Sequence, residues 1–67
     1  MKKTLENQIK NRIIIETREC GESKMTTLYN FQEVKVDEVA QQIRVCCDGR
    51  YYYFGTYNSH ITDIEVY

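Results

Sequence analysis

The chain has 67 residues, nine basic and ten acidic side chains and a formal net charge of −1. A chain of this length is expected to form a single domain, residues 1–67, burying only about 60% of the surface that the unfolded form exposes, so self-association or a tight partner is expected to add stability. The near-zero charge excludes a global field that attracts nucleic acid or an anionic membrane, and any such binding must come from a local patch.

The cysteine content and the hydropathy pattern indicate a reduced, cytoplasmic protein. Three cysteines leave one unpaired, and Met1-Lys2-Lys3 is not followed by the apolar segment of a secretory signal. The longest aliphatic run, Ile13-Ile14-Ile15, is far too short for a membrane span. We therefore expect a cytoplasmic location and no membrane partner.

The first segment with a recognisable pattern runs from Thr4 to Lys10. Leu5 and Ile9 are spaced four residues apart, and Thr4 is a suitable N-cap. This pattern predicts a short N-terminal helix, which would need tertiary packing to be stable.

Two strands are predicted next, over Arg12–Arg18 and Lys24–Gln32, because both are rich in β-branched or aromatic residues and a Gly-containing turn lies between them. A turn centred on Gly21-Glu22 would pair Ile15 with Leu28. Both faces of this hairpin are then partly apolar, so the sheet needs a cover on each side. The candidates are the N-terminal helix, curvature of the sheet into a barrel, or a second subunit.

The stretch from Val34 to Ile43 has two readings. Val34 and Val36 alternate as in a strand, whereas Val36, Val39, Ala40 and Ile43 follow helical spacing after a potential N-cap at Asp37. We favour a strand through Val36 followed by one or two helical turns over Asp37–Gln41. A loop without a helix is the alternative.

The strongest local signal is Asp48-Gly49 between two β-prone runs, Ile43–Cys47 and Arg50–Phe54. Asp-Gly suits a two-residue type I′ turn, in which both central residues have positive φ. That turn sets a register that pairs Cys47 with Arg50. The pairing then continues residue by residue away from the turn, as far as Ile43 opposite Phe54. One face then holds Ile43, Val45, Cys47, Tyr52 and Phe54, and the other holds Arg44, Cys46, Tyr51 and Tyr53. The first set is predicted to be core and the second a displayed surface.

A last strand is predicted over His60–Tyr67, where Thr62, Ile64 and Val66 alternate with Asp63 and Glu65. Basic residues crowd the start of the chain and these acidic residues close it, so pairing of the two ends would neutralise both. The strand list predicts a mostly β fold: a small curved antiparallel sheet or partly open SH3-like or OB-like barrel of about five strands with a short N-terminal helix. An α+β meander is the alternative.

The candidate metal ligands are Cys20, Cys46, Cys47 and His60. Adjacent residues on a regular strand point to opposite faces, so Cys46 and Cys47 cannot both reach one ion, and we expect no metal and no other cofactor. Cys46 is the better candidate for a reactive thiol or an intermolecular disulfide. A Cys–His nucleophile pair would also need an oxyanion hole and a cleft that so short a chain can scarcely build, so we do not expect an enzyme.

The aromatic cluster of the main hairpin is the strongest functional signal. Tyr and Arg are enriched at the energetic centres of protein interfaces, and the predicted binding residues are Arg44, Arg50, Tyr51, Tyr53 and Tyr57. These residues indicate a homodimeric or partner-bound module that inhibits or regulates another protein. High Lys, Ile, Asn and Tyr usage adds the hypothesis of a phage-encoded anti-defence protein. The alternative is single-stranded nucleic-acid binding, in which bases stack on the same rings.

Overall fold

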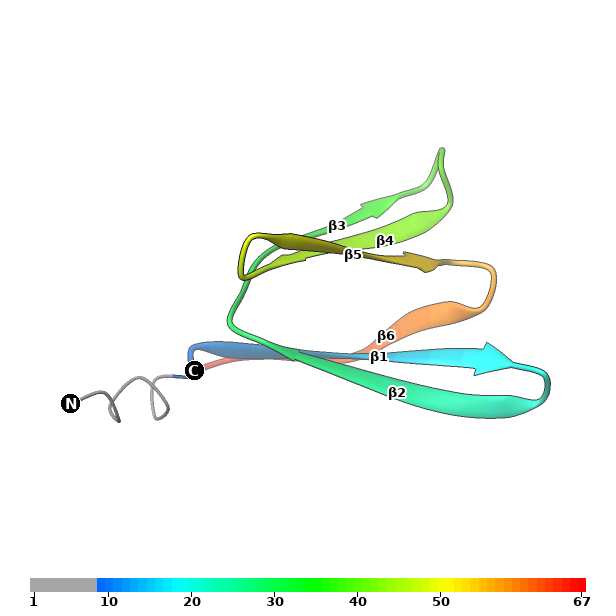
Figure 1. Cartoon of the computed structure of the whole chain (residues 1–67), viewed down its shortest axis with the longest axis horizontal. Helices are drawn as coiled ribbons and strands as arrows, with labels where there is room; N and C mark the ends of the chain where they lie inside the picture. Colours follow the sequence, from blue (N-terminus) through cyan, green and yellow to red (C-terminus); the bar gives the residue numbers. More distant parts are fainter. Residues whose placement is uncertain (1–8) are drawn as a thin grey trace.

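The computed structural model describes residues 9–67, which form an all-β structure of two antiparallel sheets (Figure 1). One sheet has the strand order β2-β1-β6 and the other β3-β4-β5. The strand bounds are β1 Asn11–Glu19, β2 Glu22–Tyr29, β3 Phe31–Asp37, β4 Gln42–Cys47, β5 Arg50–Gly55 and β6 Ser59–Val66. The predicted mostly β class is therefore confirmed. The helix predicted over Thr4–Lys10 lies almost entirely outside the described residues.

The β4–β5 hairpin has the register that Asp48-Gly49 predicted. Cys47 pairs with Arg50, and the pairing continues in step to Ile43 opposite Phe54. Asp48 has φ of 56° and Gly49 of 76°, as a type I′ turn requires. The predicted division of side chains between the two faces follows from this register.

The β1–β2 hairpin has a different register from the predicted one. Ile15 pairs with Thr26 and Ile13 with Leu28, a shift of two residues, because the turn is centred on Cys20-Gly21 and not on Gly21-Glu22. Cys20 and Gly21 have φ of 53° and 80°. The turn is thus another left-handed pair, which a Cys in the first position did not signal. A shift of two residues leaves each side chain on its predicted face.

The long strand predicted over Lys24–Gln32 is broken at Asn30, where the chain leaves one sheet and enters the other. Asn30 has φ of 56°, a left-handed conformation that Asn tolerates better than most residues. The Asn11 side chain holds this corner, because its Nδ2 donates to the Phe31 carbonyl (3.0 Å) and its Oδ1 accepts from the Phe31 amide (2.8 Å). The residues after the break join the strand predicted through Val36 and form β3. The described part of the chain has six strands, against the approximate five of the predicted fold.

The helical turns predicted over Asp37–Gln41 are absent, and a four-residue turn connects β3 to β4. Asp37 nevertheless acts as a cap, since its Oδ1 accepts from the amides of Val39 and Ala40, both at 3.1 Å. Gln41, with φ of 57°, then returns the chain to the sheet. The side-chain cap was recognised correctly from the sequence, and it closes a hairpin loop instead of starting a helix.

β6 returns to pair with β1, as predicted, but with a bulge. Ile13 pairs with Ile64 and Ile15 with Ile61, so Thr62 is an extra residue between the two registers. Its hydroxyl donates to the Ile14 carbonyl (3.1 Å).

The core lies between the two sheets, which face each other in Figure 1. Ile13, Ile15 and Val45 are fully buried, and Ile43 and Cys47 nearly so. The partly buried side chains packed against them are Leu28, Phe31, Val34, Tyr52, Phe54 and Ile61. No ladder joins the two sheets within residues 9–67, so the architecture is a pair of small sheets and not the predicted barrel. No helix in this part of the chain is long and apolar enough to cross a membrane.

Candidate functional site

The outer face of the β3-β4-β5 sheet carries most of the predicted binding residues. The β4–β5 register places Arg44 opposite Tyr53 and Cys46 opposite Tyr51, on the side away from the core. Tyr51 and Tyr53 are 55% and 57% exposed although they lie within a strand. We call Arg44, Cys46, Tyr51 and Tyr53 the Tyr/Arg face.

The Arg44 guanidinium is held against an aromatic ring. Its central carbon lies 5.3 Å from the centroid of the Tyr51 ring, the diagonal neighbour of Arg44 on β5, and the Tyr51 and Tyr53 ring centroids are 6.4 Å apart at 31°. On its other side Arg44 is paired with Lys35 of β3. The contact with Tyr51 orders the Arg44 side chain on this face.

The charges beside the Tyr/Arg face nearly cancel. The β3–β4 register places Glu33, Lys35 and Asp37 on the same side of the sheet as Arg44. These four side chains comprise two anions and two cations. The face is therefore an aromatic surface with a mixed polar rim and has no continuous basic track.

Two of the predicted residues lie elsewhere. Arg50 pairs with Cys47, so it belongs to the opposite face of β5, at the turn end of the strand. Tyr57 is in the β5–β6 turn, 84% exposed, with its ring so close to Gly55 that a Cβ there would overlap it. Tyr53 and Tyr57 both line a hollow of about 280 Å³, whose other walls include Thr17, Lys24 and Thr26 of the other sheet.

The cysteines divide between the two faces as the strand alternation predicted. Cys47 is buried, its thiol donates to the Tyr29 carbonyl (3.0 Å), and burial raises its pKa. Cys46 lies on the outer side, near the Gln32 side chain, which also accepts from the Asp48 amide. Cys20 is exposed at the β1–β2 turn. In the part of the chain that the structure describes, no group of three or more His, Cys, Asp or Glu side chains could hold a metal ion.

His60 pairs with Glu16 on the outer side of the β2-β1-β6 sheet, whereas Cys47 faces the core and Cys46 the outer side of the other sheet, so the structure does not form the Cys–His pair. The Nε2 atom of His60 lies 3.3 Å from Glu16 Oε1 on the outer side of the β2-β1-β6 sheet. Glu16 also accepts a hydrogen bond from Ser23 and contacts Arg18. The Ser23 hydrogen bond, followed by the charge of Arg18, lowers the pKa of Glu16.

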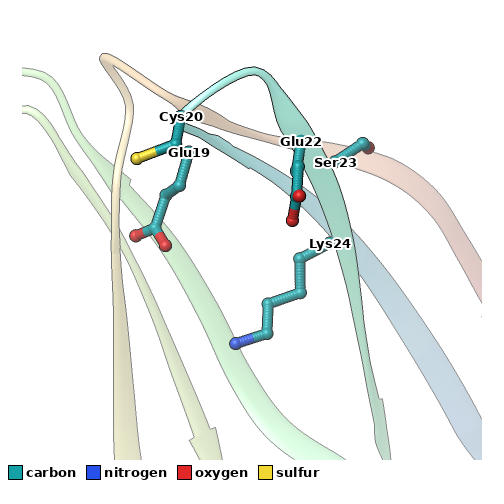
Figure 2. Close-up of a pocket in the computed structure, with 5 residues that line it drawn as sticks. All are labelled: Glu19, Cys20, Glu22, Ser23 and Lys24. Atoms are coloured by element: carbon teal, nitrogen blue, oxygen red, sulfur yellow. The ribbon is translucent and has the colours of Figure 1, made fainter.

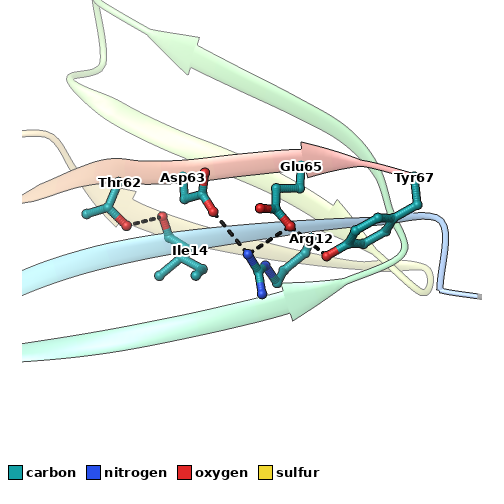
Figure 3. A network of polar contacts seen from close by, with 6 residues as sticks. All are labelled: Arg12, Ile14, Thr62, Asp63, Glu65 and Tyr67. Atoms are coloured by element: carbon teal, nitrogen blue, oxygen red, sulfur yellow. Dashed lines mark hydrogen bonds and ion pairs between the residues drawn. The ribbon is translucent and has the colours of Figure 1, made fainter.

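A second polar cluster on that sheet joins the two ends of the described chain (Figure 3). Arg12 on β1 contacts Asp63 (3.1 Å) and Glu65 (2.9 Å) on β6, which confirms the predicted pairing of the chain ends for this residue. Burial alone would lower the pKa of Arg12, but the hydrogen bond to Asp63 and the charge of Glu65 raise it. Tyr67 donates to Glu65 (2.7 Å), which raises the pKa of Tyr67. The sequence did not indicate that Tyr67 would join this cluster.

A hollow of about 370 Å³ lies at the tip of the β1–β2 hairpin (Figure 2). It is lined by Glu19, Cys20, Glu22, Ser23 and Lys24, all of which are exposed. Water therefore reaches every group there, and the hollow lacks the apolar walls that enclose a small molecule. Among the surfaces of residues 9–67, the Tyr/Arg face is the one where two exposed aromatic rings and a guanidinium contact one another.

Comparison with known proteins identifies no relative: no family model, no curated protein and no solved structure matches the chain.

Proposed function

We propose that this protein is a small protein-binding module that contacts its partner through the Tyr/Arg face. The observation that carries the proposal is the exposure of Tyr51 and Tyr53, each above one half, with Arg44 already stacked over Tyr51. Rings on a strand have few conformations to lose on binding, and Tyr and Arg are the residues most often found at interface hot spots.

The charge pattern supports a protein partner over a nucleic acid. A single strand could stack bases on Tyr51 and Tyr53, an arrangement worth about 1–3 kcal/mol per base, and this remains the alternative function. However, binding to a phosphate backbone depends on several cations, whereas Glu33 and Asp37 lie on the same face as Lys35 and Arg44. The mixed rim is typical of protein interfaces.

We further propose that binding inhibits or regulates the partner in the cytoplasm, without catalysis by this chain. All three cysteines are free thiols, which suits a reducing compartment. A phage-encoded protein that blocks a host defence complex is the concrete form of this proposal, and its support is the small size and the residue usage of the chain.

The test is crosslinked capture from an extract of the organism that carries the gene, with identification by mass spectrometry. Tyr51→Ala and Arg44→Ala should each weaken capture of one defined protein by about tenfold, the loss of a hot spot, and leave the thermal transition nearly unchanged. Met25→Ala is the matched control, because Met25 is equally exposed, at 59%, on the other sheet.

Two results would contradict the proposal. One is a collapse of the thermal transition in Tyr51→Ala, which would make the ring structural. The other is tight binding of a single-stranded oligonucleotide that weakens steeply with salt and is lost in Tyr51→Ala, which would establish the alternative function.

A further inference from the structure

The four outer strands of the two sheets differ in how they are protected. β3 and β6 each carry several charges along their length. β2 carries charges only at its start, Glu22 and Lys24, and β5 likewise carries only Arg50 at its start. Charged side chains and Pro on an edge strand prevent it from pairing with another chain. β5 begins with Arg50 and continues as Tyr-Tyr-Tyr-Phe-Gly. β2 and β5 are therefore the two outer strands of the described residues with an uncharged run, and β5 is the one whose run is aromatic.

The turn geometry shows which backbone groups of β5 are available. A two-residue turn closes with hydrogen bonds between Cys47 and Arg50, and bonded pairs then alternate along the ladder, so Arg50, Tyr52 and Phe54 bond to β4. The amide and carbonyl of Tyr51 and of Tyr53 point away from β4. Gly55 ends this free edge, since its carbonyl accepts from the Asn58 amide (3.3 Å).

We propose that β5 pairs antiparallel with β5 of a second copy of this chain, about a twofold axis at Tyr52. In this register Tyr51 lies opposite Tyr53 of the second copy, and the reverse holds by symmetry. Each such pair exchanges two backbone hydrogen bonds, so the outward groups of Tyr51 and Tyr53 in both copies are all satisfied.

A second copy fits this edge for reasons of symmetry and charge. The free groups of Tyr51 and Tyr53 match themselves in antiparallel orientation, and no charged side chain lies between Tyr51 and Phe54 to oppose its copy. The pairing also places Tyr51 beside Tyr53 of the second copy on the outer face, a favourable cross-strand aromatic pair.

The dimer would join two three-stranded sheets into one of six strands. The two Tyr/Arg faces then become one continuous surface, although the pairing itself does not depend on the proposed partner. The small core, with Ile13, Ile15 and Val45 as its fully buried side chains, gains stability from the added ladder.

Two measurements on the unaltered chain test this pairing. NMR measures the hydrogen exchange of single amides, and analytical ultracentrifugation measures the fraction of dimer at the same concentrations. The Tyr51 and Tyr53 amides should become protected as the protein dimerises and should lose protection on dilution. Met25 and Thr27 are the internal control, because the β1–β2 register directs their amides outward from β2, and these should exchange freely throughout. A protein that stays monomeric, or a dimer in which the Tyr51 and Tyr53 amides exchange freely, would overturn the proposal.

Tyr53→Lys provides the matching variant test, since a cation at the middle of the edge would face the second copy. We expect the dissociation constant of the dimer to rise by at least about tenfold, with the monomer fold retained because Tyr53 is exposed. Met25→Lys places the same cation on the β2 edge and should leave the dimer unchanged. Equal weakening by both variants would contradict pairing through β5.

Discussion

The two sheets are built from strands at very different separations along the chain. β3, β4 and β5 follow one another, and each adjacent pair is joined by a short turn. The β2-β1-β6 sheet instead takes its third strand from the end of the chain, so that Asn11 pairs with Val66. One sheet is thus determined by local turn chemistry, and the other also needs a contact that closes nearly the whole chain.

The largest expected change in stability comes from β1, the central strand of the β2-β1-β6 sheet. Ile13→Ala should destabilise the fold by about 2–5 kcal/mol, because the side chain is fully buried and the neighbouring strands cannot close the cavity. A domain of this size is expected to have only about 3–5 kcal/mol available, so the variant should be largely unfolded by circular dichroism. Val39→Ala is the control, at 97% exposure in the β3–β4 turn, and should unfold in urea as the parent does.

A comparison of the two type I′ turns should give the next largest effect. Cys20→Asn should stabilise the β1–β2 hairpin by about 0.5–1 kcal/mol, because Asn tolerates the left-handed conformation that Cys20 adopts at φ of 53°. Asp48→Asn at the corresponding position of the other turn should change stability little, since Asp already tolerates it. Urea unfolding of both variants measures the change in the free energy of unfolding. An equal change in Cys20→Asn and Asp48→Asn would contradict the prediction that only the Cys20 position is unfavourable for its turn.

The smallest expected effect concerns pH and the outer side of the β2-β1-β6 sheet. The fold lowers the pKa of Glu16, chiefly through the hydrogen bond from Ser23, so ionised Glu16 stabilises the native state. This contribution is complete above the pKa of the unfolded chain and is lost as the pH falls through the lower pKa of the folded state. Glu16→Gln should therefore flatten the acid limb of stability against pH. Gln32→Glu, on the other sheet, is not expected to flatten it.

The β3-β4-β5 sheet was largely predictable from the sequence. Asp48-Gly49 indicated the turn, and the alternation from Ile43 to Phe54 then placed each side chain, including the separation of Cys46 from Cys47. Arg50 shows the limit of that reasoning, because the same register that placed Tyr51 outward should have removed Arg50 from the binding set.

The β2-β1-β6 sheet was less predictable, because the residues next to its turn and to its boundary with the other sheet do not indicate the backbone conformation there. A Cys at the first turn position did not indicate positive φ, and nothing adjacent to Asn30 marked the break between β2 and β3. The Asn11 side chain that holds this corner comes from another strand. The acidic residues near the end of the chain did indicate the partners of Arg12, because opposite charges attract whatever their separation in the sequence.

The bulge at Thr62 has a consequence for changes in chain length. With regular alternation after Ile61, the side chains of Asp63 and Glu65 would face the inner side of the sheet, and Ile64 would face outward. The extra residue reverses this parity, so Ile64 lies opposite Ile13 while Asp63 and Glu65 meet Arg12. Insertion or deletion of one residue at this exposed position would therefore move every side chain after it in β6 to the opposite face of the sheet. Substitution at Thr62 is a surface change, whereas a change in length there would turn Asp63 and Glu65 away from Arg12 and toward the inner side of the sheet.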